Sequence, residues 1–588
     1  MANFCHTLFP FSGHLCEMPA VHIEKVCISI CARQRKEKHF FSLTDENTGL
    51  KNLLQRNILY SRTLFTVGAV WFNGNDCLKA WKIMKKTGFD NEKYLKEQSE
   101  AILERAERSG NKLYLEFGGK LAYDYHAARI LPGFDPNVKL KLLQRLKDKI
   151  DVIICIYAGD IERKKVRADF GIAYDADTMR IIDSLRDKGI IVKSVVVTRY
   201  EDHPLVNNFI NKLTRRGVRV YKHPPIKGYP ADVDRIASDN GYGANEYIET
   251  TKPIVIVTGP GPSSGKMATC LSQVYHEQKR GIMAGYAKFE TFPVWSLPLN
   301  HPVNIAYEAA TADIGDINMV DPFHLDKYGQ IAVNYNRDIE IFPVVNRICA
   351  KIMGEENAYK SPTDMGVNRV GFAITNDEIV RAAASQEIIR RYFRYCCDYV
   401  TGSADQQTVN RVKNLMDNLN LKETDRPVVL PARQAAEEAA TTPGKGNDNF
   451  FCGAALELPD GTIITGKNSP LMHAASSCIL NAIKRLAGLP DELLLISPEI
   501  IQSLGSFKKE IWKSKKLSLA LDEMLIALSV SVPGNPDAKL AVKCLKNLAG
   551  CEIHLSHIPA PGDEAGLRRL GINLTADAKF ASRDLFID

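Results

Sequence analysis

The sequence predicts a multidomain α/β protein whose largest part is a doubly wound, mostly parallel sheet. Short β-branched apolar runs, such as residues 254–257, alternate with amphipathic segments of helical length. Glycines separate helical segments from the strands that follow them, as at Gly189 and Gly217. With 588 residues, the chain is long enough for three or more domains of about 150 residues each.

Composition narrows the class of protein. The hydrophobic fraction of 45% and the charged fraction of 25% are ordinary for a globular protein. A net charge of +7 is too small on this length to indicate a nucleic-acid partner. No run of 18 apolar residues occurs, so we expect no membrane partner. The 14 cysteines are scattered without a C-x-x-C pair, which predicts free thiols in a cytoplasmic protein.

Residues 1–83 differ from the rest of the chain. They hold five of the cysteines and have poor hydrophobic periodicity. We expect Met84 to be the natural start, with residues 1–83 a poorly ordered extension or mis-called upstream sequence. The alternative is a small, divergent appended domain.

An α/β domain is predicted over residues 84–350, because helical and strand patterns alternate there at the spacing of parallel βαβ units. The strands are expected at residues 112–117, 151–157, 191–198, 218–221 and 254–257, and the helices at 90–108, 138–148, 178–188 and 205–216. Ligands of such sheets lie beyond the carboxyl ends of the strands. The turn that follows residues 254–257 is therefore the first place to look for a site.

That turn is rich in glycine and leads through Gly265-Lys266 into a helical pattern. Amides of such a turn and of the helix start point toward an anion, and the lysine adds a positive charge. The layout predicts that a phosphorylated small molecule, ATP or another phosphate-containing ligand, binds here. The candidate binding residues are Gly259, Gly261, Ser263, Ser264, Gly265, Lys266 and Thr269.

Two departures from the G-x-x-x-x-G-K-[ST] pattern bear on the chemistry. Pro260 puts the first glycine one residue further out, a spacing that resembles the phosphate loop of dethiobiotin-synthetase-type enzymes. Met267 replaces the hydroxyl residue that normally contacts Mg²⁺, and Thr269 follows two residues later. The sequence thus favours phosphate binding over hydrolysis. A glycine–proline turn with a solvated lysine is the alternative.

Three carboxylates, Asp313, Asp316 and Asp321, lie close together after the phosphate-loop-like turn. Carboxylate oxygens suit Mg²⁺, so Asp313 and Asp316 are candidate magnesium ligands. A polar loop that ends in a helix N-cap explains the same residues without a metal.

A mainly helical subdomain is expected over residues 351–430 and a linker over 431–449. The remainder, 450–588, resembles cytidine-deaminase-like domains in the order Cys452-Gly-Ala-Ala, Asp460-Gly and His473-Ala-Ala. Those domains bind zinc through this histidine and a later Pro-Cys-x-x-Cys, beside a catalytic glutamate. Here Ala475 occupies the glutamate position, and Ser497-Pro498 is followed by neither cysteine. We therefore expect no zinc and an inactive domain.

From about residue 86 to the end, the chain resembles a bacterial family described only as a domain of unknown function, numbered eighteen forty-six. The motifs are Gly88-Phe-Asp-Asn-Glu, Thr258-Gly-Pro-Gly-Pro-Ser-Ser-Gly-Lys, Ser361-Pro-Thr-Asp-Met-Gly and Asp522-Glu-Met-Leu. The resemblance implies a multidomain α/β fold and no settled activity. A peptidase is disfavoured, because His276-Glu277 lacks the second histidine of H-E-x-x-H.

Two functions fit these observations. The first is an ATP-dependent kinase or ligase, and the second is a non-catalytic nucleotide-binding protein that serves in sensing or assembly. Met267 favours the second. The sequence specifies neither the substrate nor the reaction, and it leaves a homo-oligomer open.

Overall fold

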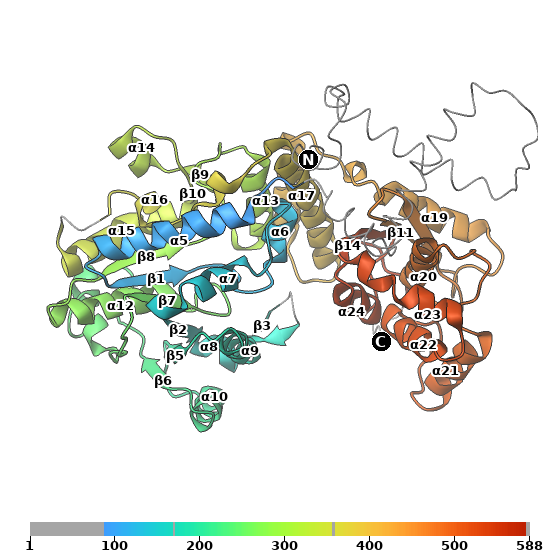
Figure 1. Ribbon diagram of the computed structural model, residues 1–588, viewed down its shortest axis with the longest axis horizontal. Coiled ribbons are helices and arrows are strands. Elements are labelled where there is room, and N and C mark those ends of the chain that lie inside the picture. Colours follow the sequence, from blue (N-terminus) through green and yellow to red (C-terminus); the bar gives the residue numbers. More distant parts are fainter. Residues whose placement is uncertain (1–86, 168–170, 356–358, 584–588) are drawn as a thin grey trace, which may run out of the picture. The chain divides into compact units, whose positions relative to one another are not determined.

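The computed structural model of the protein describes residues 87–583 except 168–170 and 356–358. The expectation for residues 1–83 lies outside this part of the chain. The largest sheet in the described residues has six strands in the order β6-β5-β2-β7-β1-β8 (Figure 1). All neighbouring strands of this sheet are parallel, as the alternating pattern predicts. The strands are β1 (Leu113–Phe117), β2 (Ile150–Tyr157), β5 (Val192–Thr198), β6 (Val220–His223), β7 (Ile254–Thr258) and β8 (Gly285–Phe289).

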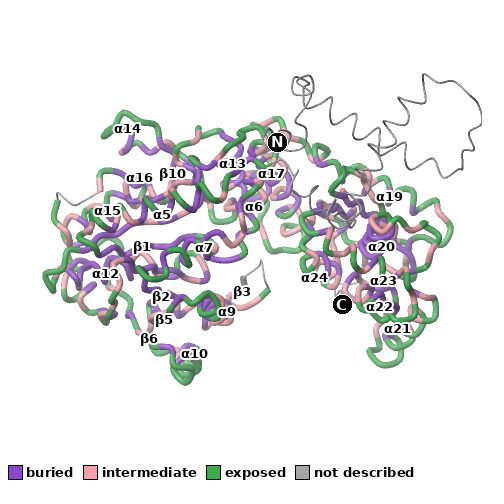
Figure 2. Tube along the Cα trace, in the orientation of Figure 1, coloured by how far each residue is buried: buried purple, intermediate pink, exposed green. Residues whose placement is uncertain are grey.

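Both faces of this sheet are buried (Figure 2). In β7, Ile254 and Ile256 belong to one hydrophobic cluster, whereas Val255 and Val257 belong to another on the opposite face. Alternate side chains of a strand point to opposite faces, so a continuous apolar run is what a doubly covered parallel strand requires.

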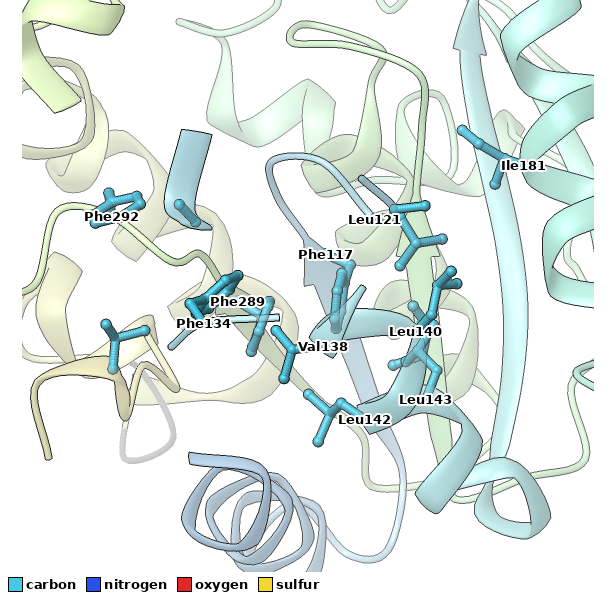
Figure 3. Packing of buried hydrophobic residues seen from close by; sticks show 14 of the residues in the cluster. Phe117, Leu121, Phe134, Val138, Leu140, Leu142, Leu143, Ile181, Phe289 and Phe292 are labelled. Atoms are coloured by element: carbon cyan, nitrogen blue, oxygen red, sulfur yellow. The ribbon is translucent and has the colours of Figure 1, made fainter. Parts of the chain in front are cut away.

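Helices cover each face. The first face carries α5 (Asn91–Arg108), α6 (Tyr125–Ile130), α7 (Val138–Arg145), α8 (Ala158–Glu162), α9 (Tyr174–Arg186), α10 (Pro204–Arg215) and α13 (Pro302–Ala310). The second carries α11 (Val233–Ile236), α12 (Lys266–Lys279) and α15 (Asn336–Met353). On the first face, Phe117 and Phe289 stack with ring centroids 4.2 Å apart, and α7 side chains such as Leu142 lie close by (Figure 3).

Smaller elements complete this α/β region. They are the strand pairs β3 (Val166–Arg167) with β4 (Ile172–Ala173) and β9 (Asn318–Val320) with β10 (Val333–Tyr335), and the helices α14 (Pro322–Tyr328) and α16 (Pro362–Met365).

Three helices follow: α17 (Asp377–Val400), α18 (Gln406–Asn418) and α19 (Val429–Thr441). The linker expectation for 431–449 is wrong for residues 431–441, which α19 occupies. Alanine and glutamate favour helix strongly, and Ala432, Ala435 and Ala439 recur at helical spacing and are buried. A composition that suggests a flexible segment therefore also fits a packed helix.

The C-terminal part contains a mixed four-stranded sheet of order β12-β11-β13-β14. Its strands are β11 (Gly453–Glu457), β12 (Ile463–Lys467), β13 (Glu552–Leu555) and β14 (Asn573–Ala576). Only the β13–β14 pair is parallel. The helices here are α20 (Ala474–Ala487), α21 (Pro498–Glu510), α22 (Leu521–Ser531), α23 (Pro536–Val542) and α24 (Pro561–Arg569).

One buried carboxylate joins α6 to α17. Glu387 is fully buried and accepts hydrogen bonds from Arg129 at 2.7 and 3.0 Å and from Arg391 at 3.1 Å, and it also contacts Arg390 and His126. Burial alone would raise the pKa of this carboxyl, but the surrounding arginines hold the pKa well below its usual range. The Glu387 charge is therefore part of the packed structure.

We predict that Glu387→Gln lowers the free energy of unfolding by about 3–5 kcal/mol at pH 7, because it leaves buried guanidinium groups without their counter-charge. Because the pKa is depressed in the folded protein, this stabilisation is present above the unfolded pKa of about 4.3 and is lost as pH falls further. Urea unfolding at pH 7 and at acidic pH measures both effects.

The matched control is Glu437→Gln, because Glu437 is exposed on α19. It should leave the urea midpoint unchanged. A Glu387→Gln protein as stable as this control at pH 7 would contradict the role of the buried charge.

Candidate functional site at the loop after β7

The glycine-rich turn leaves the carboxyl end of β7, which lies between β2 and β1, and ends where α12 begins at Lys266. Its conformation requires glycine at two points. Gly265 has φ of +89°, and a Cβ there would lie 2.7 Å from the Thr198 side chain. A Cβ on Gly261 would lie 2.5 Å from the Tyr174 ring. The loop is thus packed tightly between its neighbours.

Several loop amides have no protein partner. In the part of the chain that the structure describes, no carbonyl or side chain accepts a hydrogen bond from the amides of Ser263, Gly265, Lys266 or Met267. Amides at a helix start lack intrahelical acceptors, and here none of the described residues supplies one. The donors are therefore available to a ligand.

The loop carbonyls, in contrast, are held by the end of β5. The Thr198 hydroxyl donates to the Ser264 carbonyl at 2.9 Å. The Arg199 guanidinium donates to the Ser263 carbonyl at 2.6 Å and lies 3.3 Å from the centroid of the Tyr157 ring. These contacts fix the backbone so that acceptors are satisfied while donors remain free.

Lys266 lies over the loop. Its Nζ is 3.3 Å from the Gly261 carbonyl and 3.5 Å from the Ser264 hydroxyl. The side chain is only partly buried. The ammonium thus stays with the loop backbone, where it can approach an anion that the loop binds.

Thr269 lies on the inner side of α12. It is 1% exposed, and its hydroxyl accepts a hydrogen bond from the Cys155 thiol at 3.4 Å. Burial raises the pKa of that thiol to about 12, with Lys266 opposing the shift. Met267 packs against the hydrophobic cluster that contains Cys155 and lies on the face of the sheet covered by α12 and α15. Neither residue places an exposed hydroxyl at the start of α12.

A second polar cluster lies beside the loop, on the face of the sheet that α12 and α15 cover. Glu116 of β1 pairs in register with Val257 of β7 on one side and Lys288 of β8 on the other. The Lys288 ammonium is 2.5 Å from Asp338 and 3.3 Å from Glu290. These four residues, Glu116, Lys288, Glu290 and Asp338, are called the lysine–carboxylate cluster below.

The lysine–carboxylate cluster is electrostatically unusual. Burial lowers the pKa of Lys288, but the carboxylates of Asp338, Glu290 and Glu116 outweigh burial and raise it. Burial and the nearby Asp338 charge raise the pKa of Glu290 against the opposing effect of Lys288. Glu116 and Glu290 also accept hydrogen bonds from the hydroxyls of Tyr286 and Tyr335. Perturbed, partly buried groups of this kind are common at functional sites.

Sequence reasoning missed most of this cluster. The sequence does contain a signal for part of it. Lys288 and Glu290 are two residues apart at the end of a strand, so their side chains point to the same face of the sheet. Asp338 comes from α15, about fifty residues later, and nothing in the local pattern connects it to Lys288.

The two predicted magnesium ligands have different surroundings. Asp313 accepts a hydrogen bond from the Tyr395 hydroxyl at 3.1 Å. Asp316 is 1% exposed and is 2.5 Å from the Arg337 guanidinium. The structure describes no group of three histidine, cysteine or acidic side chains arranged to bind a metal. The magnesium site stays a prediction.

The comparisons with known proteins place the chain in a family. A family model described as the N-terminal domain of unknown function DUF1846 matches residues 87–420, and the C-terminal model of the same family matches 424–586. The chain belongs to the DUF1846 family. The resemblance that the sequence motifs indicate is thereby confirmed.

Relatives in this family carry only an uncharacterised name. A "UPF0371 protein" of Clostridium botulinum (strain Kyoto / Type A2) is 57% identical over 502 residues, which cover 85% of this chain and 99% of that protein. A "UPF0371 protein" of Clostridium tetani (strain Massachusetts / E88) is 56% identical with the same coverage. Among the helices that the structure describes, none combines the length and apolar character needed to cross a bilayer.

The loop geometry yields a prediction about stability. Gly265→Ala should destabilise the protein by more than the about 1–2 kcal/mol of a left-handed backbone alone, because its Cβ also meets Thr198. Gly281→Ala is the matched control. Gly281 follows the other end of α12 with φ of +73° and has open space around it.

Thermal unfolding of the two variants makes the comparison. Equal losses for Gly265→Ala and Gly281→Ala would mean that the loop is not held against β5.

Proposed function

We propose that this protein binds the phosphate group of a nucleotide or phosphorylated metabolite at the loop formed by residues 259–266. The observation that carries the proposal is the set of free amides at the start of α12, beneath an ammonium that folds over the same turn. Backbone donors and a helix N-terminus favour a multiply charged oxyanion. The residues assigned to the ligand are Gly261, Ser263, Ser264, Gly265 and Lys266.

We further propose that the reaction, if the ligand is ATP, is phosphate or nucleotide transfer of the kinase or ligase class. Support comes from the lysine–carboxylate cluster, which lies on the same face and next to the strand that leads into the loop. Lys288 supplies a charge for a phosphate, and Glu290 supplies a carboxyl whose raised pKa suits proton transfer. A magnesium ion would enter with the phosphates, and Asp316 is the candidate ligand that the Lys288 and Asp338 charges reach, since both contribute to the shift of its pKa.

Binding without turnover is the second candidate function. Met267 at the usual hydroxyl position and the burial of Thr269 favour it, since neither offers the side-chain oxygen that usually orients Mg²⁺. In this version the protein is a sensor, and the C-terminal part serves assembly or ligand recognition. The cytidine-deaminase-like description of that part is also a proposal, supported by its hairpin and its helix after His473. Because the zinc-binding cysteines and the catalytic glutamate are missing, the domain is inactive in this proposal.

The phosphate site predicts a specific loss in one variant. With ATP or pyrophosphate at 100 times its Kd, the native protein should gain about 2.7 kcal/mol of stability. Lys266→Ala should lose most of this gain, while Lys279→Ala, at the exposed far end of α12, should retain it. Thermal-shift and calorimetric titrations measure the effect.

Equal ligand stabilisation in Lys266→Ala and Lys279→Ala would refute the assignment, as would no stabilisation of the native protein by any phosphate compound. If binding is found, nucleotide turnover with a pool of small metabolites separates the two candidates. ADP or AMP release supports the transferase or ligase, and binding without release supports the sensor.

A further inference from the structure

The C-terminal part contains a cavity of about 780 Å³, a size that suits a small organic molecule. Three helices begin at residues that line it, namely α20, α22 and α24, whose N-caps are His473, Ala520 and Ala560. All three N-caps line the cavity. Each helix start carries a partial positive charge. The Leu521 and Glu523 amides of α22 are bonded to Asp563 and Asp522, so among the described residues α20 and α24 supply the unpaired amides that favour an acceptor group.

A fully buried carboxylate orients the histidine at this wall. Asp563 accepts a hydrogen bond from the Leu521 amide at 2.9 Å through Oδ1, and its Oδ2 lies 2.7 Å from Nδ1 of His473. Both oxygens of Asp563 are thereby used within the protein. The contact leaves Nε2 as the ring nitrogen of His473 that is available to the cavity.

An unpartnered polar group lies at the same wall. His557 is 6% exposed and lines the cavity, and its Nδ1 is buried without a hydrogen-bond partner in the described part of the chain. Burial, with a further contribution from His473, lowers the pKa of His557 to about 4, so the ring is neutral at pH 7. A buried ring nitrogen without a partner is unfavourable unless a ligand or water supplies one.

Exposed apolar side chains also line the cavity. Trp512, Ile526 and Phe580 line it with exposed fractions of 61%, 63% and 47%. Lys508, which also lines the cavity, is already paired with Glu523 at 2.7 Å. Large apolar side chains gathered at the mouth of a cavity with a polar wall are typical of a ligand site.

We propose that this cavity binds a small organic anion with an apolar body. Its carboxylate or phosphate oxygens accept hydrogen bonds from Nε2–H of a protonated His473 ring paired with Asp563, from His557 and from the free amides at the starts of α20 and α24. Its apolar body lies against Ile526, Trp512 and Phe580. The site is separate from the loop after β7 and uses none of its residues.

Saturation-transfer NMR on the full-length protein tests the proposal with three probes: phenylacetate, phenyl phosphate and neutral benzyl alcohol. Both anions share the apolar ring of the neutral probe, so the difference reports on the polar wall. At least one anion should bind about tenfold more tightly than benzyl alcohol, which corresponds to about 1.4 kcal/mol. The stronger of the two identifies a carboxylate or a phosphate as the preferred group.

Variants locate the binding. His473→Gln should remove the preference for the anion, and Ile526→Gln should weaken all three probes. Val530→Gln is the matched control, because Val530 is equally exposed on α22 but does not line the cavity. Lys266→Ala should leave binding of the preferred anion unchanged, which separates this site from the loop.

Three results would overturn the proposal. They are no saturation transfer to any probe at millimolar concentration, equal affinity for anions and benzyl alcohol, and equal effects of Ile526→Gln and Val530→Gln. Circular dichroism of His473→Gln shows whether a loss of binding is a loss of folding, and Ile526→Gln decides the matter in that case because its side chain is on the surface.

Discussion

The whole α/β region depends on a sheet that is buried on both faces. Six parallel strands with helices above and below leave only the two ends of the sheet open to solvent. The apolar side chains of β7 are buried in two hydrophobic clusters, one on each face of the sheet, so they cannot contact a ligand. Polar chemistry is therefore confined to the strand ends, where the backbone turns and its amides are no longer paired within the sheet.

Local patterns predicted much of this arrangement. Patterns of neighbouring residues predict the strand β7, the ends of several helices and the start of a helix after Gly265. The structure has these elements at the predicted places. The pairing of β7 with both β1 and β2 is different, because the chain crosses over two other strands, β5 and β2, on its way from β6 to β7. Contacts that depend on this order, such as Thr198 with Ser264 or Lys288 with Asp338, could not be derived from spacing.

Two buried charge clusters illustrate how location separates a structural role from a functional one. Glu387 has all of its oxygens occupied by arginines and a histidine between helices, so its charge is balanced by the protein alone. The lysine–carboxylate cluster contains one ammonium for three carboxylates and lies next to unpaired loop amides. An excess of partly buried negative charge beside free donors is balanced more easily when a cation or a ligand proton is present.

The start of α12 bears on what the loop could do with a bound phosphate. In a metal-dependent transfer, the ion is usually oriented by a hydroxyl at this position, yet Met267 faces a hydrophobic cluster and the Thr269 hydroxyl is bonded to Cys155. An ion that accompanied the ligand would thus be held by phosphate oxygens and by carboxylates from neighbouring strands. The register places Glu116 one strand away from the loop, so under the proposed function the lysine–carboxylate cluster, rather than α12 itself, would supply such ligands. Phosphate binding would then belong to the loop after β7, and any chemistry would belong to the lysine–carboxylate cluster. A relative could therefore retain binding without the chemistry.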